Sequence, residues 1–199
     1  MRKLFFLILI CGGIWKINSH TSKVILGPGV MASEKPYQKE ISPRVDHILG
    51  DSTIQELAEF RIKAKVLSKE EYRLGKEADF SPVDLALGWE NMSDESVLEK
   101  ITISQSGRFY RWHVDSFPIP RREIETQSAN MHLIPVNDSV ANKIMKVRQG
   151  DIIKMSGSLV NVISADGNWR WKSSQTRDDT GNGACELVWV KNFQIITPH

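Results

Sequence analysis

The sequence has few cysteines and no excess of charge of either sign. Only 2 of its 199 residues are Cys, and 26 Lys and Arg stand against 24 Asp and Glu. Three of those cations, Arg2, Lys3 and Lys16, lie in the first 19 residues, which leaves 23 basic against 24 acidic residues in the remainder. Nonspecific nucleic-acid binding depends on clustered positive charge, so nucleic acid is a poor candidate for the partner.

Motifs that hold metals or cofactors are also missing. Neither GxxxxGK[ST] nor GxGxxG occurs, so the sequence offers no phosphate-binding glycine loop. The five histidines are scattered and no Cys pair accompanies them, which argues against a zinc site. The run 178–183 resembles the start of a calcium loop, but Trp189 stands where the bidentate Glu is required. We therefore expect no metal and no cofactor.

The chain opens with a hydrophobic segment. After Met1-Arg2-Lys3, an uninterrupted apolar run begins at Leu4 and ends at Trp15. A helix of this length spans about 18 Å, less than the ~30 Å hydrocarbon core of a bilayer. The length is typical of the apolar part of a secretory signal, and the preceding cations predict an N-terminus inside the cell.

Two interpretations of this segment predict export, and a cytoplasmic protein is the third. An uncleaved anchor over 1–17 would contact the membrane and leave a single-pass protein whose C-terminal domain lies outside the cytoplasm. A cleaved signal would instead give a periplasmic or secreted protein. Cys11 lies in this segment, so Cys185 is the only thiol of the remaining chain, and no disulfide can form within that part.

The body of the chain is expected to be one domain behind a linker. Residues 18–54 contain Gly27-Pro28-Gly29 and two further prolines without a sustained apolar period, which is typical of a linker. From Phe60 to Val66 (FRIKAKV), apolar and cationic residues alternate as in a strand with one solvated face. Residues 55–199 are therefore predicted to form a single α+β domain.

Three short helices and several strands are expected in this domain. Ser81-Pro82 is a helix-start signal for 81–88, and further helices are predicted over 93–101 and 140–147. Strands are predicted over 108–114, 131–136, 152–163 with a bend at Gly157, 169–174 after the turn at Asp166-Gly167, and 187–190. The expected fold is a small curved antiparallel sheet or OB-like barrel with about three short helices, behind an N-terminal hydrophobic helix.

Three passages carry a resemblance to other proteins. They are DFSPVDLALGW at 79–89, SANMHLIP at 128–135 and WRWKSSQTRDDTGNGACE at 169–186. Over residues 60–190 the chain resembles a group of uncharacterised, mostly proteobacterial proteins with an N-terminal hydrophobic segment. The resemblance implies a folded and exported domain, and it implies no catalytic residues.

The strongest candidates for catalysis are Cys185, His132 and Arg177. A thiol with a histidine base and an arginine that holds an oxyanion or a carboxylate could make a hydrolase or a transpeptidase. Sortases use such a trio in an extracytoplasmic barrel, but the short motifs around the sortase nucleophile are missing. The alternative, which we favour, is that Cys185 starts the strand at 187–190 as a small buried residue.

Two aromatic-basic stretches are candidates for ligand binding. Trp169 and Trp171 are predicted to share one strand face, and Tyr110 and Trp112 to share another. On an OB-like barrel such faces stack bases or sugars. The commoner alternative is core packing of the rings beside extended Arg and Lys side chains.

The favoured function is therefore a binding or assembly module of the cell envelope without catalysis, whose partner is an envelope protein or a glycan. One alternative is an extracytoplasmic enzyme that uses Cys185 and His132. The other is an OB-like nucleic-acid-binding module, whose affinity would collapse with added salt. A change of Cys185 to Ser should abolish the activity of the enzyme and leave that of a binding module intact.

Overall fold

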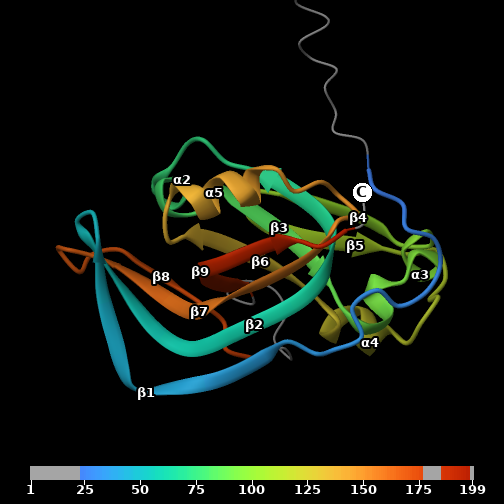
Figure 1. Cartoon of the computed structure of the whole chain (residues 1–199), viewed down its shortest axis with the longest axis horizontal. Coiled ribbons are helices and arrows are strands. Elements are labelled where there is room, and N and C mark those ends of the chain that lie inside the picture. The colour runs from blue at the N-terminus through green and yellow to red at the C-terminus, as the bar shows by residue number, and fades with distance from the viewer. Residues whose placement is uncertain (1–22, 177–184, 198–199) are drawn as a thin grey trace, which may run out of the picture.

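The computed structural model describes residues 23–176 and 185–197. These residues form nine strands, four α-helices and one 3-10 helix, so the expected α+β class is confirmed, with strands predominating (Figure 1). In chain order the elements are β1 (Tyr37–Leu49), β2 (Ser52–Glu71), α2 (Lys76–Phe80), β3 (Val83–Gly88), η1 (Glu90–Ser93), α3 (Glu95–Leu98), β4 (Thr102–Ser106), β5 (Phe109–His113), α4 (Arg121–Thr126), β6 (Ser128–Pro135), α5 (Asp138–Met145), β7 (Ile152–Ser164), β8 (Arg170–Lys172) and β9 (Glu186–Ile195).

The hydrophobic segment at the N-terminus lies outside the described residues. Between residues 23 and 197, with 177–184 left aside, none of the helices has the length and apolar character that crossing a bilayer requires. The anchor and the cleaved signal therefore both stay predictions.

Five strands form a closed ring of pairings. β2 pairs with β3, β3 with β6, β6 with β9, β9 with β7, and β7 returns to β2. The β6–β9 pair is parallel and the other four are antiparallel. A closed ring leaves no unpaired strand edge between its members, which removes a site of unwanted strand addition.

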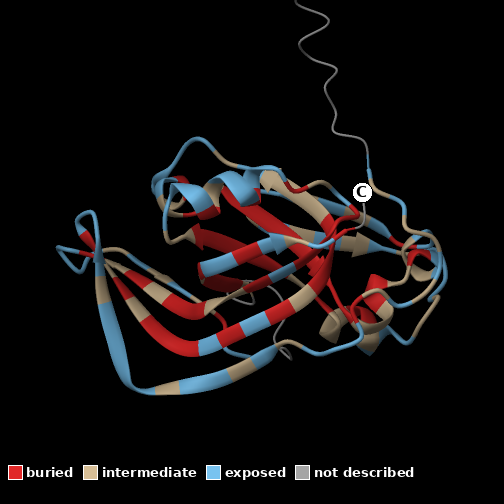
Figure 2. Ribbon diagram, in the orientation of Figure 1, coloured by how far each residue is buried: buried red, intermediate tan, exposed pale blue. Residues whose placement is uncertain are grey.

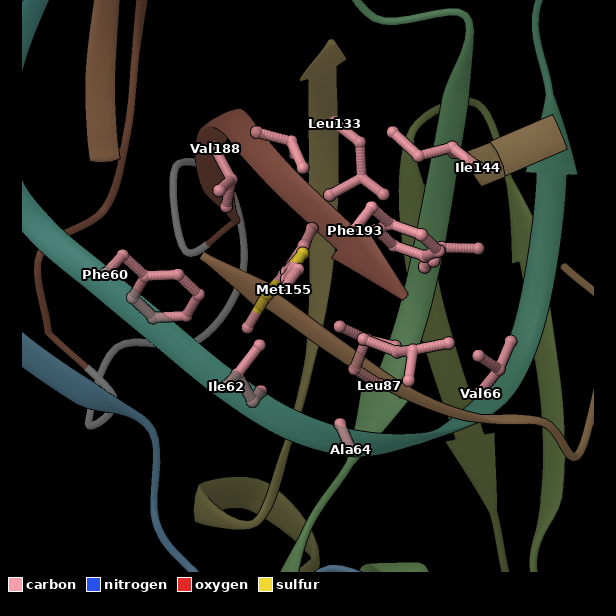
Figure 3. Close-up of a cluster of buried hydrophobic side chains, with 14 of the residues drawn as sticks. Phe60, Ile62, Ala64, Val66, Leu87, Leu133, Ile144, Met155, Val188 and Phe193 are labelled. Atoms are coloured by element: carbon pink, nitrogen blue, oxygen red, sulfur yellow. The ribbon is translucent and has the colours of Figure 1, made fainter. Parts of the chain in front are cut away.

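Apolar side chains from these strands meet inside the ring. Phe60, Ile62, Ala64 and Val66 of β2 all belong to one buried cluster, as the alternation in FRIKAKV predicts. They converge with side chains of the other barrel strands, and Ile144 of α5 packs against the same cluster (Figure 3). The predicted helix over 140–147 is thus confirmed, and its apolar face joins the core of the barrel.

Further elements cover parts of the outer surface of the ring. Between β3 and β6 the chain forms η1, α3, the β4–β5 hairpin and α4, whose apolar residues pack on Leu67 and Ala86. A second outer cluster joins Ile134 and Leu187 to Trp169 and Trp171 near β8. Each of the two clusters buries a different side of the barrel wall.

The structure differs from the linker expected over 18–54. In its described part, β1 pairs with β2 from Tyr37 opposite Arg61 to Leu49 opposite Ser52. The preceding segment is also held to the domain, because the Val24 amide donates to the Gln149 carbonyl at 2.8 Å and Ala32 is fully buried. Most of β1 is exposed (Figure 2), so the strand is held by backbone pairing and buries few apolar side chains. Its sequence therefore has no apolar period that would predict a strand.

The helix predicted over 81–88 is wrong, because Val83–Gly88 is β3. All six of its residues are buried, so no alternation marks them as a strand, and a short apolar run does not distinguish a buried strand from a helix. The Ser81 hydroxyl donates to the Val83 carbonyl at 3.2 Å, and Ser81 follows the end of α2 instead of starting a helix.

The remaining predicted elements are confirmed with shifted ends. Asp94 caps α3 through its side chain, and the strands β5, β6, β7, β8 and β9 fall where strands were expected. The Gly167 amide donates to the Ser164 carbonyl in the predicted hairpin turn, and the β7–β9 register shifts between Ser156 and Gly157, at the expected bend.

Candidate functional site

A buried polar cluster lies on the outer side of β3 and β6. Asp84 and His132 are directly opposite in the ladder. Both residues are buried, with exposed fractions of 0% and 4%. Asp84 Oδ2 lies 2.9 Å from His132 Nδ1, an ion-pair distance that lacks hydrogen-bond geometry. Arg108 Nη1 donates to the other carboxylate oxygen at 2.7 Å. A buried carboxylate requires a counter-ion, and for Asp84 the main one is the Arg108 guanidinium.

Aromatic rings enclose this cluster. The Arg108 guanidinium carbon lies 3.7 Å from the centroid of the Tyr72 ring and 5.4 Å from that of Trp171. The His132 ring lies 4.9 Å from Trp171 between centroids. Burial raises the pKa of the Tyr72 hydroxyl, which also accepts a hydrogen bond from the Arg108 amide at 2.9 Å. The β4–β5 hairpin and β8 thus hold the polar groups between them.

Cys185 borders the same cluster at the start of β9. Its Sγ lies 3.8 Å from both the Arg108 carbonyl oxygen and Asn130 Nδ2. Asn130 in turn donates to the Arg108 carbonyl at 3.1 Å and accepts from Gln105 Nε2 at 2.6 Å. Cys185 is half-buried and immediately precedes β9, which begins at Glu186, so the expected burial of this residue is only partial.

The structure therefore places Cys185 and His132 around one cluster, but their contacts differ. His132 contacts Asp84 and Trp171, whereas the Cys185 thiol contacts Asn130 and the Arg108 backbone. Arg177 lies outside the described residues. Sequence reasoning missed Arg108 as the partner of Asp84, because a cation in a hairpin turn carries no sign in the sequence of the carboxylate that it contacts.

The aromatic candidates belong to two separate clusters. Trp169 and Trp171 lie 6.3 Å apart between centroids and pack in the outer cluster near β8. Tyr110 and Trp112 pack with the residues between β3 and β6. Tyr110 is hydrogen-bonded to Ser128 at 3.1 Å, and burial raises its pKa to about 12. Each predicted face is confirmed, but the four rings do not form one stacking surface.

An open groove of about 430 Å³ lies on the outer wall of the barrel. It crosses β2, β7 and β9 beside the start of β1. Along one row Arg61 is opposite Ser156, which is opposite Asn192. The groove is lined by Glu34, Lys35, Tyr37, Arg61, Ile62, Lys63, Lys154, Met155, Ser156, Asn192 and Gln194.

This basic groove, as we name the cavity with that lining, is positively charged. Its described lining has four cations, Lys35, Arg61, Lys63 and Lys154, and one carboxylate, that of Glu34. Over the described residues the salt bridges involve none of these four cations. The near-zero net charge of the body hides this local excess, which arises where Lys35 and Lys154 join the two cations of β2.

A second cavity of about 730 Å³ lies between the β1–β2 turn and α2. Leu49, Phe80 and Pro135 form apolar parts of its lining, and Lys76 extends over the Trp169 ring at 4.8 Å. Its charged groups are Lys76 with the carboxylates of Asp51 and Asp79. The cation and the two carboxylates give it no excess of positive charge.

Within residues 23–176 and 185–197, no three His, Cys, Asp or Glu side chains are grouped so as to hold a metal ion. Comparisons of the chain with protein-family models, with curated proteins and with solved structures found no match.

Proposed function

We propose that this protein is a binding module of the bacterial cell envelope, without catalysis, that takes its ligand in the basic groove of an OB-type barrel. The basic groove carries the proposal, because it is an open cavity whose four cations are without ion-pair partners in the described chain. A concave site with a few convergent polar groups is the usual form of a binding site.

The strand topology supports the OB-type barrel named in this proposal. Counted within the ring, the strands β2, β3, β6, β7 and β9 are the first to fifth, and the first pairs with both the second and the fourth. The third and fifth strands are parallel, and α5 connects the third to the fourth. Five strands in a Greek-key barrel are the pattern of the OB fold, whose members bind oligonucleotides and oligosaccharides mainly on the face of the second and third strands. The basic groove lies instead on the first, fourth and fifth strands, so the proposed site rests on the charges of the groove and not on the fold.

The surroundings of the thiol favour binding over catalysis. A general base must reach the proton that it abstracts and is itself oriented by a hydrogen bond. His132 is 4% exposed and faces Trp171, and its contact with Asp84 lacks hydrogen-bond geometry. The Arg108 guanidinium compensates the buried carboxylate of Asp84, so this ion pair has a structural role without catalysis.

The envelope location rests on the N-terminal sequence. Cations before the apolar run at 4–15 predict export of the domain, with the membrane as a partner if the segment is retained. Leu74 is 92% exposed, so a cysteine introduced there reports the compartment without disturbing the core. In a Cys11→Ser, Cys185→Ser background, Leu74→Cys should react with a membrane-impermeant maleimide in intact cells. Reaction only after permeabilisation would contradict export.

Binding is tested with the full chain in detergent and isolated cell-wall sacculi, by co-sedimentation. We expect the wild type and Cys185→Ser to sediment equally, and Ser156→Trp, which fills the basic groove, to sediment less. Ser104→Trp on β4, at an exposed strand position outside the basic groove, is the matched control. Loss of co-sedimentation in Cys185→Ser, together with unchanged co-sedimentation of Ser156→Trp, would instead favour the thiol enzyme.

A further inference from the structure

Two lysines face each other across the floor of the basic groove. Lys63 of β2 and Lys154 of β7 are directly opposite in the antiparallel ladder. Like charges in this relation destabilise a sheet. Neither lysine forms an ion pair with any described carboxylate, so no salt bridge of the described chain compensates these two like charges. An anionic ligand would compensate them.

The cations are arranged in rows together with neutral hydrogen-bonding groups. The row of Lys63 and Lys154 continues to Gln194, and the neighbouring row runs from Arg61 through Ser156 to Asn192. Residues two apart on one strand face are separated by about 7 Å, so the two rows offer positive charge at a regular interval. The Asn192 amide donates to the Ser156 hydroxyl at 3.2 Å, which leaves the amide oxygen as an acceptor beside the cations.

This mixture of groups selects among anionic polymers. Single-stranded nucleic acids are bound by aromatic platforms on which successive bases stack. Among the described residues, Tyr37 is the only aromatic one in the lining, and the Arg61 guanidinium carbon lies over its ring at 4.1 Å from the centroid. Amide and hydroxyl groups beside ammonium and guanidinium groups instead suit a chain with hydroxyls and spaced anions.

We infer that the basic groove binds an acidic polysaccharide, a sugar chain that carries carboxylate or phosphate groups. This inference rests on the proposed function and names the class of its ligand. Lys63, Lys154 and Arg61 contact the anionic groups, and Ser156, Asn192 and Gln194 contact the sugar hydroxyls. Charge-assisted hydrogen bonds of this kind are stronger than neutral ones and weaken with added salt.

The test measures binding of the full chain in detergent to four fluorescent polymers by anisotropy. Polygalacturonate supplies carboxylates, a phosphorylated mannan supplies phosphates, dextran is neutral and poly(dT) is a nucleic acid. We expect one or both acidic polysaccharides to bind at least tenfold more tightly than dextran and poly(dT). The polymer that binds distinguishes carboxylate from phosphate as the recognised group.

The variant Lys63→Gln/Lys154→Gln should weaken binding of the acidic polysaccharide at least tenfold. Removal of the repulsion should leave its thermal midpoint at or above that of the wild type, so the loss cannot be attributed to unfolding. Arg170→Gln/Lys172→Gln removes two exposed cations of β8 outside the basic groove and should bind as the wild type does.

Other outcomes separate the two claims. Equal binding of dextran and the acidic polymers, lost in Ser156→Trp, would overturn the ligand class and retain the proposed function. Tighter binding of poly(dT) would overturn the ligand class in favour of nucleic acid. Failure of all four polymers and of the sacculi would overturn both claims.

Discussion

Lys65 of β2 and Glu95 of α3 form an ion pair that is almost fully buried, with the two residues 1% and 2% exposed. The pair joins the barrel wall to the elements inserted between β3 and β6. Lys23 reaches the other carboxylate oxygen of Glu95 at 3.0 Å, so the segment that precedes β1 is tied to the same point. One carboxylate therefore connects three parts of the chain.

Breaking the Lys65–Glu95 pair from one side should be strongly destabilising. Glu95→Leu leaves the Lys65 charge buried without its partner, and we expect it to lower the free energy of unfolding by about 3–5 kcal/mol. Lys65→Met should cost less, because Glu95 keeps its ion pair with Lys23. The double variant Lys65→Met/Glu95→Leu should be more stable than either single variant, because no buried charge is left in the pair. Urea unfolding followed by circular dichroism measures all three. A double variant as unstable as the sum of the single ones would contradict this account.

The stability of the domain should fall in acid. Burial raises the pKa of Glu95, but hydrogen bonds from Lys65 and Lys23 outweigh it and hold the pKa below the ordinary 4.5. The pKa of Glu56 is lowered in the same way, because burial raises it but hydrogen bonds with Lys191, Ser158 and His47 outweigh the effect of burial. A carboxylate whose pKa is lower in the folded state stabilises it above the unfolded value, and this stability is lost as the pH falls through the folded pKa.

The measurement is the free energy of unfolding between pH 7 and the acid limit of folding. We expect it to decline below about pH 4.5, where these carboxyls begin to bind protons in the unfolded chain. Glu56→Gln should reduce the slope of that decline, and Asp46→Asn, at an exposed position of β1, is its control. Identical slopes in the wild type and Glu56→Gln would contradict the assignment.

Gly157 should tolerate no side chain. A Cβ at this position would lie 1.9 Å from the Trp189 carbonyl oxygen, at the register shift where β7 bends against β9. Gly157 and Trp189 both lie in barrel strands, whose backbones cannot easily move apart. We therefore expect Gly157→Ala to lower the free energy of unfolding by about 3 kcal/mol or more, at the upper end of the cost of overpacking. Gly167→Ala is the control, since its Cβ would meet nothing within 4 Å and only its φ of 70° adds strain. Equal thermal midpoints for the two variants would contradict the close approach.

How far the sequence predicts this fold depends on whether a residue's neighbours are local. The alternation around Phe60 and Ile62 arises because one face of this strand lies in the core, so the sequence alone predicts the strand. Val83–Gly88 lies between the core and the inserted elements, so it is buried on both faces and its alternation is lost. β1 is mostly exposed and contributes backbone pairing alone.

The candidate site was less predictable than the fold for the same physical reason. Lys63 was expected on a solvated strand face, but its opposition to Lys154 is set by the register of two strands that lie far apart in the chain. The partner of Asp84 was equally hidden, because Arg108 lies in the hairpin turn between two other strands, β4 and β5. Composition gives only the total charge and does not show which charged residues strand pairing brings together.

A single charge reversal in the basic groove should change stability and binding in opposite directions. Lys154→Glu places a carboxylate directly opposite Lys63 and converts a cross-strand repulsion into an attraction. We expect the free energy of unfolding to rise by about 0.2–1 kcal/mol, the range of such pairs in sheets. Binding of an acidic polysaccharide should weaken, because the new carboxylate both neutralises Lys63 and repels the ligand. Lys172→Glu on β8, measured by the same urea unfolding and anisotropy titrations, should change neither quantity appreciably. A less stable Lys154→Glu would mean that the lysines are not in repulsive contact, and the main argument for an anionic ligand would then fail.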